Sequence, residues 1–438
     1  MNRFQSLCAA ALLAMLCVAP AAAEVAAQST YSCNGLDEQQ KFAAVEGADG
    51  VFYRVHPDLH MFSSFSEVSA DRVAALSKSL AALGTTLVFV PVPTKSLAMP
   101  DQLPQAARDY GYDASLAATV YLEGIKKLQK RGVAVVDARL ALHAAKDAKP
   151  SFFLTDYRMT AAGAEREAKA IADIIAKTPG FADLPKGRFE VTAAGSTILE
   201  SAMRSALQRH CLLPLPLAES DTFAAARMQS ATASKGNTIF GGGGGRIAVV
   251  GTEIDGDPVS GLAGFVAKFT GLDTIQYAVE GGGAFAAITS YMTSGGFQEA
   301  RPSYLVWAVP VQDSLANFGD QPFAELTAAA GDGCRVPLPV MANPQGNSVV
   351  ADLGALDPSQ SYTLLLEVDS TAVSAAQFDF TTGAGQIVSK AVYRSKDQVK
   401  TGRFFMPMSG LPPEGARTVE IRMDEASGGN PRVTACFN

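Results

Sequence analysis

Hydrophobic and polar residues follow a helical period and then a strand-like run, and this order occurs twice in the first third of the chain. Apolar residues recur at helical spacing over 71–83, and Gly84 ends the pattern as a helix C-cap does. The apolar run that follows, over 86–92, is typical of a buried strand. A helix over 114–130 and a strand over 133–136 repeat the order. Such alternation predicts a parallel sheet covered by helices.

The pattern continues less regularly further along the chain. We expect elements in this order: helix 161–176, a helical stretch at 196–208, strand 246–251, helix 262–269, strand 274–278, helix 284–292 and strand 303–311. Trp307, the only tryptophan, lies in the last of these strands, and its expected role is packing in the core. The five glycines at 241–245 precede a strand, whereas a phosphate loop follows one, so we interpret them as a mobile surface loop.

Beyond Cys334 the helical signal fades. Short strands are expected at 362–368, 373–380, 402–408 and 417–423, separated by clusters of Gly, Pro, Asp and Ser. Strands at this spacing predict an all-β sandwich. The expected fold class is therefore α/β, with a mainly parallel sheet flanked by helices, followed by an all-β sandwich. The corresponding domains are 24–330 and 334–438.

The chain begins with the features of a secretory signal peptide. Residues 1–23 contain Arg3, an apolar run and a group of alanines before Glu24, where we expect cleavage. The apolar run is too short to span a bilayer, and no later segment reaches about 18 uninterrupted apolar residues. The sequence therefore predicts export without a membrane span.

Four cysteines remain after this cleavage, and an even number in an exported chain suggests disulfides. Three pairings are possible. Sequence position favours Cys33 with Cys211 and Cys334 with Cys436, because each pair brackets one compositional unit. Zinc is the competing interpretation, but the chain has no C-x-x-C pair. We therefore expect neither a metal nor a cofactor.

The chain is acidic, with a formal net charge of −7. This charge opposes nucleic acids and other polyanions, so a polyanion would have to bind at a local basic patch. One candidate patch lies between two expected strands and consists of Lys390, Arg394, Lys396, Lys400 and Arg403. Two interpretations remain open. The patch is a solvated hairpin face, or its side chains share one face and bind the carboxylates of an acidic polysaccharide.

The segment RIAVVGTEIDGD places polar residues directly after a buried strand that ends at Gly251. In open α/β sheets, residues just beyond the carboxyl ends of strands carry the chemistry. A serine two residues after this glycine would be the nucleophile of an SGNH-type acyl hydrolase or O-acetyltransferase. The residue at that position is Glu253. The scaffold therefore resembles an acyl-transfer fold whose nucleophile has been replaced.

A second candidate segment, SFFLTDYRMT, leads into the helix expected at 161–176. In SGNH-like enzymes, an Asp and a His lie close together in such a loop, and the Asp orients the imidazole that deprotonates the serine. Asp156 is present, but the position of the base holds Arg158. An arginine stays protonated at neutral pH and cannot act as the base.

Two of the four histidines, His56 and His60, flank Asp58 and superficially resemble a set of metal ligands. Pro57 breaks any helix that would align these side chains. We therefore do not expect a metal site here.

Six segments resemble the family of the alginate biosynthesis proteins AlgX and AlgJ: GVFYRVHPDL, VFVPVPTKS, DYGYDASLA, FFLTDYRMT, IAVVGTEID and YLVWAVPV. The resemblance implies an SGNH hydrolase-like domain, a periplasmic location and a role in the O-acetylation of alginate. It also implies that the C-terminal sandwich is a carbohydrate-binding module, that the four mature cysteines form the family's two disulfides, and that other polysaccharide export or acetylation proteins are partners.

The family's catalytic positions are changed in this chain. The nucleophilic serine is replaced by Glu253, and the basic histidine by Arg158. The glutamate that follows the tryptophan of the last strand is replaced by Ala308, and no arginine follows further on. Because only Asp156 is retained, the resemblance does not extend to the acetyl-transfer mechanism.

Two hypotheses about function follow. In the first, the protein is catalytically silent and binds an acidic, alginate-like polymer during export or O-acetylation, and Glu253 and Arg158 form a salt bridge in place of the catalytic pair. In the second, the site is active. It is then an O-acetyltransferase, or it modifies a polysaccharide by means of Glu253 and a second carboxylate, which could be Asp156, Asp255 or Asp257.

Overall fold

The computed structural model describes residues 29–61, 65–145, 148–228, 245–254 and 258–437. The expected signal peptide and most of the glycine run lie outside these residues, as do Asp255 and Asp257. Across the described ranges, no helix is both long enough and apolar enough to cross a membrane.

Five strands form the central sheet, in the order β4 (Ala134–Val135), β3 (Thr86–Val92), β9 (Tyr304–Pro310), β7 (Arg246–Gly251) and β8 (Asp273–Ala278). Every neighbouring pair is parallel. All residues of the central strand β9 are buried, as expected for a sheet covered on both faces. The predicted parallel sheet is therefore confirmed.

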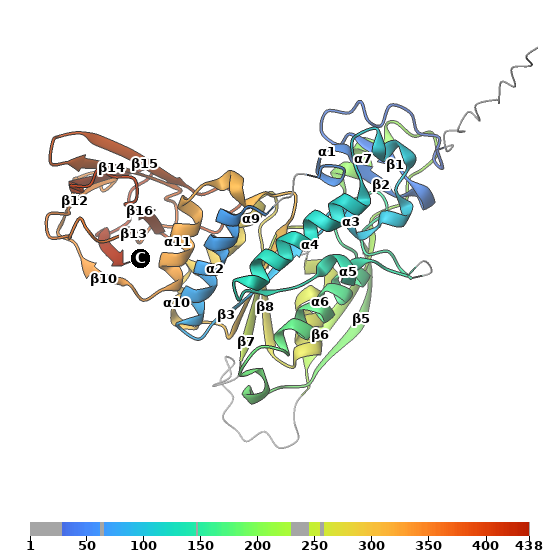
Figure 1. Ribbon diagram of the computed structural model, residues 1–438, viewed down its shortest axis with the longest axis horizontal. Coiled ribbons are helices and arrows are strands. Elements are labelled where there is room, and N and C mark those ends of the chain that lie inside the picture. Colours follow the sequence, from blue (N-terminus) through green and yellow to red (C-terminus); the bar gives the residue numbers. More distant parts are fainter. Residues whose placement is uncertain (1–28, 62–64, 146–147, 229–244, 255–257, 438) are drawn as a thin grey trace, which may run out of the picture.

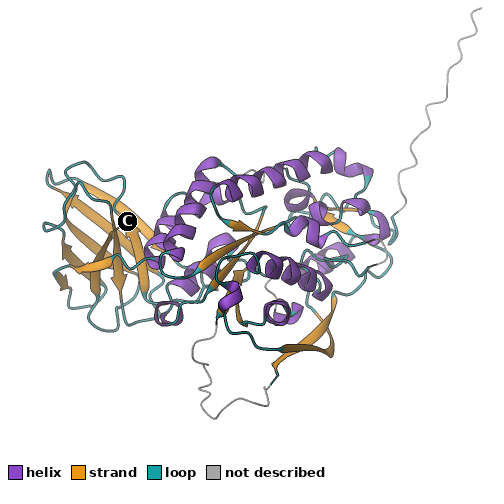
Figure 2. Ribbon diagram, turned by 60° about the horizontal axis from the view of Figure 1, so that its bottom comes forward, coloured by secondary structure: helices purple, strands orange, loops and turns teal. Residues whose placement is uncertain are grey.

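Helices cover both faces of this sheet (Figures 1 and 2). One group contains α2 (Glu67–Ala81), α4 (Ala114–Lys130), α9 (Gly283–Met292) and α11 (Gln321–Ala330). The other group contains α5 (Ala138–Leu142), α6 (Ala161–Ile175) and α8 (Leu262–Thr270). Two further short helices are α3 (Lys95–Ala98) and α10 (Gly295–Glu299).

Local sequence explains where the long helices begin. The side chains of Ser66, Asp113 and Thr160 each accept a hydrogen bond from the backbone N–H three residues further on, so they cap α2, α4 and α6. A Cβ atom on Gly163 would lie 2.2 Å from the carbonyl oxygen of Ser151. The start of α6 can therefore pack closely on the preceding loop only because residue 163 is glycine.

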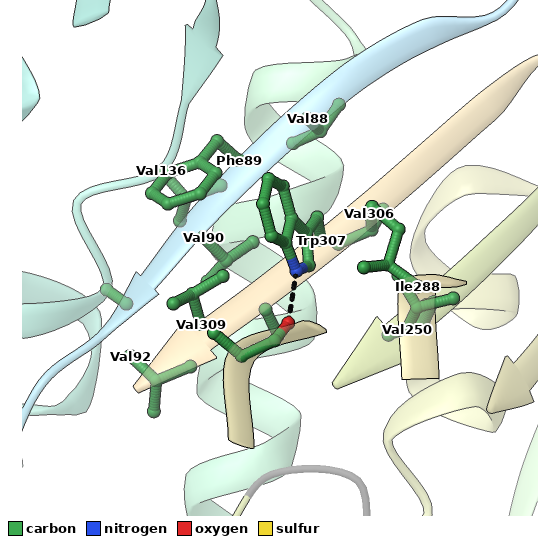
Figure 3. Close-up of a cluster of buried hydrophobic side chains, with 14 of the residues drawn as sticks. Val88, Phe89, Val90, Val92, Val136, Val250, Ile288, Val306, Trp307 and Val309 are labelled. Atoms are coloured by element: carbon green, nitrogen blue, oxygen red, sulfur yellow. Dashed lines mark hydrogen bonds between the residues drawn. The ribbon is translucent and has the colours of Figure 1, made fainter. Parts of the chain in front are cut away.

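Trp307 lies at the centre of the sheet, with Phe89 and Val250 as its neighbours on the adjacent strands. Its side chain is fully buried, and its Nε1–H donates to the carbonyl oxygen of Ala284 over 3.0 Å (Figure 3). The ring of Phe285 also packs against the indole, with centroids 5.5 Å apart. The predicted core role of Trp307 is confirmed, and replacement by alanine would cost about 3–5 kcal/mol.

A smaller cluster covers the amino-terminal part of the described chain. It contains side chains of the antiparallel pair β1 (Ala44–Glu46) and β2 (Phe52–Arg54) and of the helix α7 (Ala202–Gln208). The single turn α1 (Val55–Asp58) follows β2 directly. The disulfide between Cys33 and Cys211 joins the two chain segments that form this cluster. This predicted pairing is confirmed.

Residues 196–198, which we expected to be helical, belong instead to an antiparallel ribbon formed by β5 (Phe189–Ile198) and β6 (Glu219–Arg227). The helix of this region begins only at Ala202. The ribbon escaped prediction because it is largely exposed and rich in Ala, Thr and Ser, so it lacks the alternation of a half-buried strand.

The C-terminal part is an all-β sandwich of two antiparallel sheets. One has the order β10 (Cys334–Pro337), β18 (Arg432–Phe437), β13 (Tyr362–Glu367) and β16 (Arg403–Pro407). The other has the order β11 (Val340–Ala342), β12 (Ser348–Asp352), β17 (Ala416–Met423), β14 (Ala375–Thr382) and β15 (Ile387–Tyr393). The predicted disulfide between Cys334 and Cys436 joins β10 to β18 and is also confirmed.

The four-stranded sheet is buried on both faces. Leu364 and Leu366 of β13 belong to the core of the sandwich, whereas Leu365 between them belongs to the core of the parallel-sheet unit. On β16, Phe404 and Phe405 divide in the same way. Because side chains alternate along a strand, this sheet packs against the other sheet and against α11 at once (Figure 1).

Candidate functional site

The candidate site lies at the carboxyl edge of the parallel sheet, where the loop after β7 meets the loop that leads into α6. The backbone N–H of Met159 donates to the carbonyl oxygen of Ile254 over 2.8 Å. Met159 also pairs with Phe152, which closes the 152–159 loop on itself. The structure therefore brings together the two segments that carry Asp156 and Glu253.

Asp156 is held by the arginine two residues further on. Its Oδ1 accepts hydrogen bonds from the backbone N–H and the Nε–H of Arg158, over 2.8 and 3.0 Å, and its Oδ2 accepts from Nη2 over 3.1 Å. The Asp156 side chain is only 2% exposed. Nη2 of Arg158 also donates to the carbonyl oxygen of Glu200 over 2.7 Å. Both carboxylate oxygens of Asp156 are thus bound by a charged fork and are not available to orient an imidazole.

Glu253 follows β7 at the predicted position and makes two hydrogen bonds. Its Oε2 accepts from the backbone N–H of Gly281 over 3.1 Å, and its Oε1 accepts from the hydroxyl of Tyr157 over 3.4 Å. Among the ion pairs of the described residues, none joins Glu253 to Arg158. The predicted salt bridge is therefore wrong, because the arginine reaches the nearby Asp156 within its own loop.

Tyr157 connects this carboxylate to a second arginine. The guanidinium carbon of Arg54 lies over the Tyr157 ring, 4.5 Å from its centroid, in a cation–π contact. Burial, and then the charge of Glu253, raises the pKa of Tyr157 to about 12. The hydroxyl therefore stays protonated at physiological pH and remains a hydrogen-bond donor.

Arg54 is itself fixed by Asp58, which is fully buried. The carboxylate accepts hydrogen bonds from the backbone N–H, Nε and Nη2 of Arg54 over 2.8, 3.1 and 2.9 Å. Nη2 also donates to Oε1 of Gln312, just beyond β9, over 3.1 Å.

Pro57 does not break the helix as we expected, because it lies in the first turn of α1, where proline is tolerated. The described ranges contain no group of three or more His, Cys, Asp or Glu side chains that could hold a metal ion.

Asp313, the next residue after Gln312, brings a second carboxyl group to the site. Burial, and then the charge of Glu253, raises its pKa to about 6, and Arg54 opposes the shift. Oδ2 of Asp313 lies 3.9 Å from the position that a Cβ of Gly283 would occupy, so this carboxyl lies beside the first residue of α9. Glu253 and Asp313 thus approach the same helix start from the ends of two different strands.

Lys95 is hydrogen-bonded to the backbone of the loop that carries Asp156. Its side chain is 1% exposed, and its ammonium donates to the carbonyl oxygens of Phe153, Leu154 and Asp156 over 2.5, 2.8 and 3.1 Å. Burial lowers the pKa of Lys95 to about 7, although the charges of Asp58 and Asp156 oppose this shift. The three carbonyls use all three donors of the ammonium group.

The predicted basic patch does not form one free face. Arg394 makes a two-armed contact with Glu325 of α11, in which Nη1 donates to Oε2 over 2.9 Å and Nη2 donates to Oε1. The two side chains are only 7% and 1% exposed. We expected Arg394 to share a solvent-exposed face with the other residues of the patch. It lies instead at the junction with α11.

Two further members of the patch are also bound within the chain. Nε of Arg403 lies 3.1 Å from Oε1 of Glu367, and its Nη1 donates to the carbonyl oxygen of Thr293 over 3.3 Å. The ammonium of Lys390 donates to the carbonyl oxygens of Pro407, over 2.8 Å, and Ser409. Of the five residues, only Lys396 and Lys400 take part in no ion pair or side-chain hydrogen bond to another described residue.

Sequence reasoning missed several residues of the site: Arg54, Lys95, Gly281, Gln312 and Asp313. Lys95 and Asp313 carried a usable signal, because each follows the end of a buried parallel strand, as Glu253 does. Arg54 and Gly281 carried none, since they reach the site from a hairpin and a turn that sequence alone did not position.

The five-stranded parallel sheet, its two helical layers and the polar loops at its carboxyl edge define an SGNH hydrolase-like protein. Residues 44–311 match the family described as "SGNH hydrolase-like domain, acetyltransferase AlgX". The chain belongs to this family.

Relatives by sequence carry the names of alginate proteins. The alginate biosynthesis protein AlgX of Pseudomonas aeruginosa is 30% identical over 273 residues, which cover 62% of this chain and 56% of that protein. The probable alginate O-acetylase AlgJ of the same species is 26% identical over 272 residues, which cover 59% of this chain and 68% of that protein. The matched region is thus little more than half the length of AlgX.

Solved structures extend the likeness to the whole fold. The structure of Pseudomonas aeruginosa AlgX aligns with a TM-score of 0.75 and 24% identity, covering 94% of this chain and 98% of that one. The O-acetyltransferase domain of Pseudomonas putida AlgJ aligns with a TM-score of 0.50 and 20% identity, covering 65% of this chain and 98% of that one. The parallel-sheet unit followed by the sandwich is therefore an AlgX-like fold.

Proposed function

We propose that this protein binds an acidic, alginate-like exopolysaccharide during its O-acetylation or export, and that it does not itself transfer acetyl groups by serine–histidine chemistry. Membership of the AlgX family and the names of its relatives support the pathway. The proposal that the protein transfers no acetyl group rests on one observation. The guanidinium of Arg158 binds both carboxylate oxygens of Asp156, and Glu253 stands where the nucleophile is expected.

The physical argument concerns the two groups that acetyl transfer needs. A serine nucleophile must lose its proton to a base, and an arginine stays protonated at neutral pH and cannot take that proton. Asp156 is bound by the guanidinium and cannot support a base elsewhere. The carboxylate of Glu253 would repel an acidic sugar from the strand-end loops.

We propose that the sandwich, residues 334–438, is a carbohydrate-binding domain and that residues 24–330 form the SGNH-like domain. Polymer contacts on the sandwich then come from Lys396 and Lys400, in the connection between β15 and β16. The ammonium group of a lysine in such a connection binds a uronate carboxylate as a point charge. Arg394, Arg403 and Lys390 take a supporting role, because their contacts within the chain fix the ends of this connection.

We further propose that the protein works in the periplasm. Two disulfides support this compartment, because disulfides persist in oxidising environments outside the cytoplasm. Partners of this process would be other polysaccharide export or acetylation proteins.

A second candidate function is modification of the polysaccharide by a pair of carboxyl groups. Asp156, the partner we first considered for Glu253, is occupied by Arg158, whereas Asp313 has a pKa raised to about 6, in part by Glu253. Acid–base cleavage of a glycoside requires a pair of carboxyl groups, and a raised pKa suits the one that donates the proton. The raised pKa of Asp313 is the single observation that favours this candidate.

The test combines a catalytic and a binding measurement on the purified mature chain. A chromogenic acetyl ester and oligomannuronate are supplied together, and ester cleavage, sugar acetylation and chain shortening are followed by absorbance and mass spectrometry. We expect no acetyl transfer above a heat-treated control, and binding of oligomannuronate that weakens with added salt. Acetyl transfer that disappears on Glu253→Ala would overturn the proposal, and chain shortening that disappears on Asp313→Asn would establish the second candidate.

The polymer contacts have their own control. The double variant Lys396→Gln, Lys400→Gln should weaken binding of oligomannuronate about fivefold or more. The matched double variant Lys41→Gln, Lys177→Gln removes the same charge from exposed positions of the parallel-sheet unit and should leave the affinity within about twofold. Equal effects of both variants would show that only net charge matters and that the connection between β15 and β16 is not the binding site.

A further inference from the structure

The sandwich has a groove where β16 ends, whereas the basic connection between β15 and β16 lies at the start of β16. Two loops, 353–361 and 408–415, and the edge strand β11 form its walls, and its volume is about 920 Å³. Loops at one end of a β-sandwich are a common place for recognition, because the sheets hold them rigidly while their sequences vary freely.

The floor of this groove is apolar because the core of the sandwich is open here. Leu356, Met408 and Leu411 pack against the buried core and remain partly exposed, and all three line the groove. The one aromatic side chain of the lining, Tyr362, is only 6% exposed. The floor therefore offers aliphatic surface and no open aromatic face of the kind on which a sugar ring could stack.

The rim of the groove is acidic. The lining contains the carboxylates of Asp352, Asp357 and Glu414, against the single guanidinium of Arg417. None of the three carboxylates belongs to an ion pair among the described residues, and all three are exposed. Like charges without a counter-ion around one groove attract a cation and repel a polyanion.

Two of these carboxylates also have fixed positions. Oδ1 of Asp352 accepts a hydrogen bond from the N–H of Gly354 over 2.8 Å, and Oδ1 of Asp357 accepts from the N–H of Ser359 over 2.9 Å. Hydrogen bonds from Ser359 lower the pKa of Asp357, so its carboxyl stays charged well below neutral pH. On the opposite wall, the ammonium of Lys390 binds the carbonyls of Pro407 and Ser409 from behind. The loop at 408–415 is thus tied down without a cation being added to the groove.

We propose that this groove binds a cationic, partly apolar peptide segment of a partner protein. The aliphatic floor suits Leu, Val or Pro side chains of such a segment, and the acidic rim suits its Lys or Arg side chains. An acidic polysaccharide is disfavoured by three unpaired carboxylates, so polymer and partner would use different parts of the sandwich. This inference does not depend on whether the polymer is bound at Lys396 and Lys400.

The test uses the full mature chain and a fluorescein-labelled decapeptide of alternating Lys and Leu, with binding followed by fluorescence anisotropy. Labelled decapeptides of alternating Glu and Leu and of alternating Ser and Leu are run in parallel, as is labelled oligomannuronate. We expect the Lys and Leu peptide to bind at least about tenfold more tightly than either control peptide, and to lose affinity as salt rises.

Variants then locate the binding. The triple variant Asp352→Asn, Asp357→Asn, Glu414→Gln keeps the hydrogen-bond acceptors of the turns but removes the charges, and it should weaken binding about tenfold. Leu411→Ala should weaken binding without affecting the salt dependence. Glu425→Gln is the control for the loss of one exposed carboxylate outside the groove, because Glu425 lies just after the far end of β17 and takes part in no ion pair among the described residues.

Each outcome decides. Thermal unfolding of every variant is measured first, so that loss of binding is read only from folded protein. Weak binding of the Lys and Leu peptide, or binding that the triple variant leaves unchanged, would overturn the proposal. Binding of oligomannuronate that the triple variant strengthens or leaves unchanged agrees with it, whereas oligomannuronate binding lost in the triple variant would assign the groove to the polymer instead.

Discussion

The strand-end site and the junction with the sandwich each contain an arginine that forks onto a carboxylate, but the two pairs connect different things. Arg158 binds Asp156, two residues away, in a loop whose arginine is 15% exposed. Arg394 binds Glu325, which lies 69 residues away on α11, and both side chains are almost completely buried. The first pair fixes one loop, and the second joins two units of the chain.

The difference in reach explains why the same residue type served two purposes. A fork between near neighbours costs little chain entropy and shapes the site locally. A buried fork between distant elements is stabilising only while both partners are present, since removal of one leaves an uncompensated charge. We therefore expect changes at the junction to affect stability more than changes at the site.

Among changes at these two regions, the largest effect is expected from Glu325→Gln. The change leaves Arg394 buried without a counter-charge at the junction, and should lower the free energy of unfolding by about 3 kcal/mol. Urea denaturation measures this loss, with the exposed Glu425→Gln as a control that should change by less than about 0.5 kcal/mol. The double variant Glu325→Leu, Arg394→Met removes both charges and should recover most of the lost stability. A double variant as unstable as Glu325→Gln would show that the loss does not come from an unpaired charge.

A smaller loss is expected from Arg158→Gln, at the other pair. Asp156 then keeps only the backbone N–H of residue 158 as its remaining bond in the loop, and the free energy of unfolding should fall by about 2 kcal/mol. The exposed Arg108→Gln serves as the control in the same urea titration. A loss larger than that of Glu325→Gln would reverse the order of the two regions.

Asp313 should make the site sensitive to pH. The pKa of Asp313 is raised from its ordinary value of 3.8 to about 6 in the folded chain, so folding favours the protonated form. The stability contributed by the protonated carboxyl is fully present below pH 3.8, and it is lost as the pH rises through about 6. Between pH 4 and pH 7, the free energy of unfolding of Asp313→Asn should therefore rise by about 1–2 kcal/mol relative to that of the natural chain.

The control for this comparison is the exposed Asp183→Asn, measured over the same pH range by thermal unfolding. Its difference from the natural chain should stay level. A level difference for Asp313→Asn as well would mean that the Asp313 carboxyl is not coupled to folding.

The smallest effect is expected from Glu253→Gln. Glu253 bonds to a backbone N–H and a tyrosine hydroxyl rather than to Arg158, and the amide can still accept a hydrogen bond, so the loss should stay below about 1 kcal/mol. The variant should also move the midpoint of the Asp313 titration to lower pH, because it removes the charge that helps to raise that pKa. A loss near 3 kcal/mol in thermal unfolding would revive the salt bridge that we had predicted.

Elements with a strong apolar pattern were predicted closely. The strand at 86–92 and the helix at 114–130 have the predicted bounds, and both end at clear stop signals. The ribbon of β5 and β6 was missed because its exposed strands carry no such pattern. Strands β10, β11, β12, β15 and β18 were also not anticipated individually, although the sandwich itself was.

The candidate site shows the same division. The rule that chemistry follows strand ends led to Glu253, and the loop that leads into the helix at 161–176 led to Asp156. The structure places these two loops side by side. The partners of these groups were not predictable. Two oppositely charged replacements suggested a pair of Arg158 with Glu253, but the arginine had a nearer acceptor, and geometry rather than charge decided between them.

The sequence by itself determined the layers of this protein and the residues that stand at its strand ends, because each is written in local pattern or in single residues. It favoured the disulfide pairing that the structure shows but left two other pairings open, because a disulfide joins segments far apart in the chain. Only the tertiary structure decided what the charged side chains do. Arg394 changed from a candidate for sugar binding to a junction residue, and Lys95 became the support of a loop. Partners of a charge are chosen by distance and burial, and both arise only when segments far apart in the chain are packed together.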